Sequence, residues 1–143
     1  MNQGNSSADF HRDKMLFFDI LAQGVVYVNQ DGIITAVNRA AENILGKNFH
    51  ALKGLLLNDA VWETLKPNLT KLPPEKHPVI IALKKGKSVL NSVIGIKNTE
   101  KKKHIWLLVN AVPEFDSNLE KPNRAFITYI RKNKHGRSKI YTA

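Results

Sequence analysis

The stretch from Gly24 to Leu45, GVVYVNQDGIITAVNRAAENIL, decides how the rest of the chain is organised. It holds two runs of β-branched and other apolar residues, which favour strands. An Asp31-Gly32 pair, typical of a tight hairpin turn, separates the two runs. Asn38 can cap a helix that follows the second run, and Gly46 is placed to end that helix. The stretch therefore predicts a β-hairpin that leads directly into a short helix.

This order of elements resembles the opening of a PAS sensory domain. Three later stretches resemble the same family in the right order and spacing: PVIIALKKGKSVLNSVIGIKN (78–98), HIWLLVNAVPEFD (104–116) and RAFITYIR (124–131). The resemblance covers residues 16–132. It implies an α+β fold, with a five-stranded antiparallel sheet, helices on one face and an N-terminal flanking helix. It also implies a role as a signal sensor.

A chain of 143 residues has the usual length of one domain. We expect a polar N-terminal tail and helix start over residues 1–15, the PAS-like domain over residues 16–132, and a basic tail or linker over residues 133–143. The flanking helix is expected from Phe10 to Gln23, because this segment is mostly apolar after its polar start.

Two further helices are expected in the middle of the chain. The first is short, capped by Asn58 or Asp59, and runs through Trp62 and Leu65. The second is long and starts at Pro74, since proline is favoured in a first helical turn. It has His77 and Pro78 in its first turn and ends at Gly86.

Three strands are expected to complete the sheet, over residues 88–97, 104–112 and 123–132. The first two are joined by a polar, charged turn, as in a hairpin. Pro113 is expected to end the second strand, because proline cannot donate to a hydrogen-bonded ladder.

The composition excludes several classes of protein. The chain has no cysteine, so disulfides, cysteine nucleophiles and zinc–thiolate sites are excluded. No run approaches the roughly 20 apolar residues that a membrane span needs, and the N-terminus lacks the apolar core of a signal peptide, so we expect a cytoplasmic protein. The net charge of +10 invites a nucleic-acid partner. That alternative is not favoured, because the basic residues lack interleaved aromatic residues apart from Tyr141 in the tail.

The sequence also gives no sign of catalysis. It contains no nucleophile elbow, phosphate-binding loop or zinc-protease motif, and none of its five histidines pairs with another at metal-ligand spacing. We therefore expect a regulatory domain without catalytic residues and without a metal site. The resemblance implies that it could serve a histidine kinase or a cyclic-dinucleotide enzyme.

The expected functional site is an interior cavity between the sheet and the helices. Alternation along the strands gives two sets of residues, and matching the Pro113 end to the family pattern selects the set that faces inward. The cavity candidates are Val26, Val28, Ile44, Ile80, Leu83, Ile94, Ile96, Leu107, Val109, Ala111, Phe126, Thr128 and Ile130. Two interpretations stay open: a packed core without a ligand, or a site for a small apolar or mildly polar ligand.

The resemblance does not identify a cofactor, which stays unknown. Flavin sensors of the light-oxygen-voltage type and photoactive-yellow-protein chromophores each need a cysteine, and the chain has none. Non-covalent flavin lacks support, because the predicted sheet face has few amide side chains. Haem needs an axial ligand, and His77 is the candidate near the long helix. Its place beside Pro78 instead favours an exposed histidine at a helix start.

We expect the chain to form a homodimer. Apolar residues run nearly all round the flanking helix, and an exposed Trp-Leu pair on the outer sheet face needs cover. The dimer-face candidates are Leu16, Phe17, Ile20, Trp106 and Leu108. The other expected partner is an effector such as a kinase, cyclase or regulator. A ligand-free dimerisation module is the alternative if side chains simply fill the cavity. The Asp-Ile-Thr ending through which the family couples to its effector is replaced here by Lys132-Asn133-Lys134, so the usual coupling route is not expected.

Overall fold

The computed structural model describes residues 16–56, 62–98, 103–117 and 120–132. An antiparallel sheet forms the body of the domain, and its six strands lie in the order β2-β1-β6-β5-β4-β3. The strands are β1 (Gly24–Asn29), β2 (Ile34–Val37), β3 (Trp62–Leu65), β4 (Val89–Asn98), β5 (Lys103–Glu114) and β6 (Arg124–Lys132). The fold is the expected α+β arrangement, with one strand more than the predicted five.

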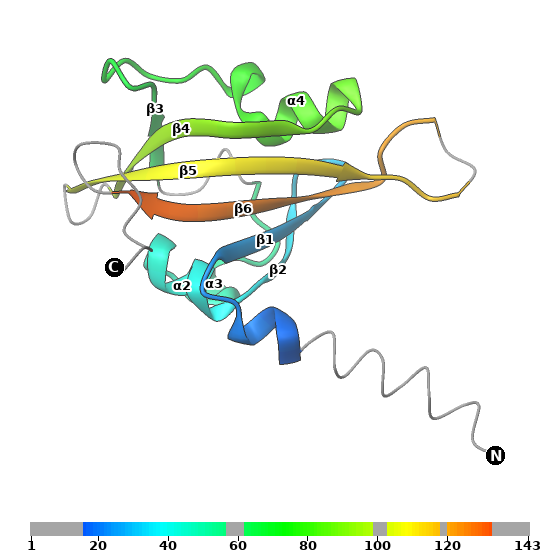
Figure 1. Ribbon diagram of the computed structural model, residues 1–143, viewed down its shortest axis with the longest axis horizontal. Coiled ribbons are helices and arrows are strands. Elements are labelled where there is room, and N and C mark those ends of the chain that lie inside the picture. The colour runs from blue at the N-terminus through cyan, green and yellow to red at the C-terminus, as the bar shows by residue number, and fades with distance from the viewer. Residues whose placement is uncertain (1–15, 57–61, 99–102, 118–119, 133–143) are drawn as a thin grey trace.

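Short helices cover one face of this sheet (Figure 1). They are α2 (Arg39–Leu45), α3 (Phe49–Leu52) and α4 (Pro78–Lys85), and a 3-10 turn, η1 (Pro74–Lys76), precedes α4. Helix α4 packs on β4, β5 and β6, and α2 packs on β1. Residues 16–20 form a further helix before β1. It ends before residue 21, so the predicted end at Gln23 is wrong, and the part of the expected helix 10–23 that precedes residue 16 lies outside the described residues.

The first hairpin and its helix form as their sequence predicts. Gly32 adopts a left-handed φ of 82° in the turn between β1 and β2. The Asn38 side chain accepts a hydrogen bond from the Ala41 amide at 2.9 Å, which caps α2. Gly46 ends α2 with a φ of 76° and donates its amide to the carbonyl of Glu42. Turn and cap chemistry therefore fixed these elements locally.

The predicted short helix through Trp62 and Leu65 is wrong, because these residues form strand β3 at the edge of the sheet. The proposed caps Asn58 and Asp59 lie outside the described residues. Trp62 and Thr64 both belong to residue types that favour strands. Strand β3 pairs with β4, from Trp62 opposite Asn98 to Leu65 opposite Gly95. Backbone pairing with β4 therefore outweighed the helix pattern of the local sequence.

Two prolines act differently from the prediction. Pro78 divides the expected long helix, because the preceding His77 is extended, with φ −63° and ψ 135°, as steric crowding before a proline favours. Pro113 does not end β5, which continues to Glu114. Pairing of β5 with β4 stops at Ala111, so at Pro113 the strand has only β6 beside it. A proline is tolerated in such a locally exposed edge.

Candidate functional site

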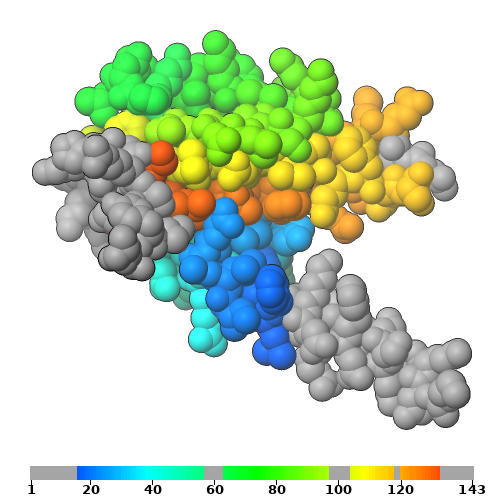
Figure 2. All heavy atoms as spheres, in the orientation of Figure 1, coloured from blue at the N-terminus to red at the C-terminus, as the bar shows by residue number. Residues whose placement is uncertain are grey.

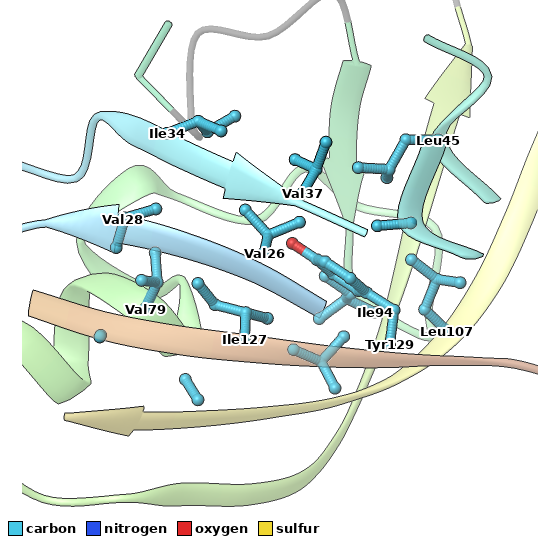
Figure 3. Close-up of a cluster of buried hydrophobic side chains, with 14 of the residues drawn as sticks. Val26, Val28, Ile34, Val37, Leu45, Val79, Ile94, Leu107, Ile127 and Tyr129 are labelled. Carbon is cyan, nitrogen blue, oxygen red and sulfur yellow. The ribbon is translucent and has the colours of Figure 1, made fainter. Parts of the chain in front are cut away.

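The inner face of the sheet and the helices enclose one cluster of apolar side chains (Figure 3). Val26 and Val28 come from β1, and Leu107 and Val109 from β5, all with no exposed surface. Seven of the cavity candidates are buried members of this cluster: Val26, Val28, Ile94, Ile96, Leu107, Val109 and Ala111. Ile44, Ile80 and Leu83 are partly buried and pack against it. The structure therefore brings together the candidates from β1, β4, β5, α2 and α4.

The three candidates on β6 face the other way. The prediction that Phe126, Thr128 and Ile130 point inward is wrong, because their half-buried side chains alternate with the buried Ala125, Ile127 and Tyr129. The reason is the register of the sheet. Ile127 lies opposite Val26 on β1 and Ala111 on β5, both of which face inward. Neighbours directly opposite in a sheet share a face.

Tyr129 is the interior residue that the prediction missed. Its side chain is 2% exposed, and Figure 3 shows its oxygen directed among the apolar side chains of the cluster. The hydroxyl makes no hydrogen bond to the described residues, but it is not one of their fully buried polar atoms that lack a partner, so a small area of its oxygen is accessible to water. Burial raises the pKa of Tyr129 well above its usual value, so the phenol stays neutral. It brings a polar atom into a core that is otherwise lined by hydrocarbon.

His77 is buried rather than exposed, contrary to the prediction. Its side chain is 5% exposed, and its Nδ1 accepts a hydrogen bond from the Val79 amide at 3.2 Å. It is therefore the cap of α4, and the other ring nitrogen carries the proton of the neutral ring. Burial lowers the pKa of His77 to about 4.

The outer face of the sheet carries a chain of aromatic rings. The Phe18 ring lies 6.0 Å from that of Tyr27, which lies 5.7 Å from that of Phe126. Phe18 belongs to the helix of residues 16–20, so these contacts join that helix to β1 and β6. Beside them, Asn110 donates to the Thr128 hydroxyl at 3.2 Å. This face is covered in part by the chain's own N-terminal helix.

Trp106 and Leu108 lie on this outer face, as predicted, but they are half-buried rather than exposed. Trp106 lies opposite Gly95 on β4. A Cβ atom built on Gly95 would come within 2.8 Å of the Trp106 ring, which shows how closely the indole covers the bare backbone. An aromatic ring over a strand glycine restores packing that the glycine cannot supply.

The apolar side of the N-terminal helix is uncovered. The exposed fractions of Leu16, Phe17 and Ile20 are 58%, 62% and 75%. In Figure 2 the blue atoms of this helix lie at the surface, next to those of β1. Three large apolar side chains within five residues form an uncommon surface for a monomer.

Hydrogen bonds of the Asn38 side chain connect the helix of residues 16–20 to the rest of the domain. Its Oδ1 accepts from the amides of Val25 and Ala41, both at 2.9 Å. Its Nδ2 donates to the carbonyls of Phe18 at 3.1 Å and Gln23 at 2.9 Å. The side chain is completely buried, and both of its donors and both lone pairs of its acceptor are in use.

A family model described as the PAS fold matches residues 15–120. The chain belongs to the PAS family. None of the curated proteins matches it.

Solved structures share the fold at low identity. A PAS domain from Colwellia psychrerythraea is 17% identical, with a TM-score of 0.62, over 83% of this chain and 94% of the other. A PAS domain of an HTR-like protein from Haloarcula marismortui is 12% identical, with a TM-score of 0.60, over 92% and 99%. The PAS domain of nitrogen regulation protein NR(II) from Vibrio parahaemolyticus is 11% identical, with a TM-score of 0.57, over 82% and 96%.

Within this PAS domain, the residues do not fit a cysteine-linked flavin or chromophore, or haem held by His77. The chain offers no cysteine for a covalent flavin or chromophore bond. His77 already uses Nδ1 in capping α4, which competes with any reorientation of its ring toward haem. The described residues hold no group of acidic, histidine or cysteine side chains that could bind a metal ion. No helix in the described part of the chain has the length and hydropathy to cross a membrane.

Proposed function

We propose that this PAS domain is a cytoplasmic sensory and dimerisation module that regulates an effector rather than catalysing a reaction. The observation that carries the proposal is the helix of residues 16–20. One of its aromatic side chains packs on the outer sheet face, while Leu16, Phe17 and Ile20 are exposed. A second copy of the chain supplies the same apolar surface, so that a twofold dimer covers both helices at once.

The effector is proposed to be a kinase, a cyclase or a transcription regulator. Two of the similar structures are PAS domains of nitrogen regulation protein NR(II) and of a two-component sensor histidine kinase. A third similar structure is a complex of DhaR(N) with DhaL. These similar proteins support a regulatory role in which a PAS domain acts beside other domains or partners.

The oligomeric state tests the dimer. Phe17→Glu places a charge on the exposed side of the helix and should convert the protein to a monomer in analytical ultracentrifugation. Leu69→Glu is the matched control, because Leu69 is 60% exposed on the turn after β3, far along the chain from the helix. The control should remain dimeric. A wild-type protein that is monomeric at high concentration would contradict the proposal.

The signal is proposed to be either a small molecule in the interior or a contact that displaces the helix. The buried cluster has the character of a packed core, which favours a ligand-free dimerisation module. The unpartnered hydroxyl of Tyr129 favours a small, mostly apolar ligand with one hydrogen-bond acceptor. Native mass spectrometry of protein purified from cells separates the two. A stoichiometric bound molecule identifies a ligand sensor, and an apo dimer supports the ligand-free module.

A further inference from the structure

Asn38 does more than cap a helix. An N-cap residue needs only an acceptor for an amide of the first helical turn, and here Oδ1 serves that need at Ala41. The two Nδ2 bonds go elsewhere, to carbonyls in the segment that precedes β1. One side chain therefore bonds to three elements at once: the N-terminal helix and its connection, the start of β1, and the start of α2.

These bonds lie where a displacement of the helix changes their geometry. Phe18 lies within the helix, and Gln23 immediately precedes β1, so the amide holds the last part of the helix and its exit. The site is tightly packed, since a Cβ atom on Gly24 would lie 3.1 Å from the Ala41 Cα. The Asn38 amide group is completely buried. If the helix moved away with the Phe18 carbonyl, it would leave a buried N–H group without a partner, which is costly.

We propose that Asn38 is the coupling point through which the position of the N-terminal helix is transmitted to β1 and α2. When the helix is docked, the four bonds of the amide are complete. Undocking the helix removes the Phe18 acceptor and forces the amide to turn or to find water, which weakens the bonds to Val25 and Ala41 as well. The inference goes beyond the proposed dimer, because it concerns a bond network within one chain.

The first test separates coupling from capping. Asn38→Asp keeps an acceptor for the Val25 and Ala41 amides but faces the Phe18 and Gln23 carbonyls with oxygen instead of N–H. Loss of two hydrogen bonds should raise the amide exchange rate of residues 16–23 by about tenfold or more. The amide of Ala41 should keep its protection, because an aspartate also caps helices.

Asn38→Ser serves as a second variant, in case a buried carboxylate prevents folding. Serine can still cap α2, but it is too short to reach the two carbonyls. Asn48→Asp and Asn48→Ser are the matched controls, because Asn48 caps α3 by the same bond, to Ala51 at 3.0 Å. The controls should leave exchange in residues 16–23 unchanged. Unchanged exchange in the folded Asn38 variants, or equal loss of protection across α2, would overturn the proposal.

The coupling must also work in the other direction. Phe18→Ala removes the ring contact with Tyr27 and should loosen the helix. The Val25 and Ala41 amide signals in NMR spectra should then shift, because their shared acceptor has moved. Phe17→Ala, at the exposed neighbouring position, should leave both signals in place. If Phe18→Ala frees residues 16–23 and the two signals stay unchanged, the helix is not coupled through Asn38.

Discussion

Strand β6 presents two apolar faces to two different environments. Ala125, Ile127 and Tyr129 point between the sheet and its helices and are almost completely buried. Phe126 and Ile130 point to the outer face and are half-buried. Hydropathy alone does not distinguish these two sets, because each contains an isoleucine and an aromatic ring. The comparison shows that the register with β1 and β5, rather than the composition of β6, decides which face is the core.

The largest expected difference between the faces concerns their two isoleucines on β6. Ile127→Ala should lower the free energy of unfolding by about 2–5 kcal/mol, since it removes a buried side chain and leaves a cavity. Ile130→Ala is the matched change on the outer face and should cost clearly less, because the site is already partly hydrated. Urea unfolding of both variants measures the two values. Equal losses would contradict the assignment of the inner face.

The second prediction concerns the protonation of His77, which is buried on the inner side of the sheet. His77 has a folded-state pKa of about 4, below its usual 6.5, because burial disfavours its charged form. Between these values the unfolded chain binds more protons, so stability rises with pH over this window. His77 should contribute a loss of about 3 kcal/mol as the pH falls from above 6.5 to 4.

His77→Asn tests this dependence, because asparagine caps helices without titrating in this range. Thermal unfolding measured across the window should be less sensitive to pH in the variant than in the wild type. His50→Asn is the matched control, because it makes the same substitution at an exposed position outside α4. A variant that retains the full pH dependence would show that other groups cause it.

Local chemistry made much of the fold predictable. The turn at Asp31-Gly32, the cap at Asn38 and the stop at Gly46 act within a few residues of themselves, and all three formed as expected. The inward set on β5 was also predicted, because strand alternation gives two sets and the family pattern matched at Pro113 selects the one with Leu107 and Val109, which are both buried.

The misses share a different cause, which is a distant partner. Strand β3 forms by pairing with the free edge of β4, and no residue near Trp62 in the sequence indicates that this edge is available. The face of β6 depends on its register with β1, about 100 residues earlier in the chain. Asn38 was predicted as a cap, but its bonds to Phe18 and Gln23 require the helix to be docked. Long-range pairing therefore decided what local patterns could not.

The smallest expected effect concerns the polar atom of the inner face. Tyr129→Phe removes the hydroxyl of a buried side chain, and this hydroxyl makes no hydrogen bond to the described residues. Because no protein bond is lost and a polar group leaves an apolar core, the free energy of unfolding should stay unchanged or rise by up to about 1 kcal/mol. Urea unfolding of the two apo proteins measures the difference. A loss of more than about 1 kcal/mol would show that the hydroxyl is bonded to an interior water, and that the inner face is less uniformly apolar than its side chains indicate.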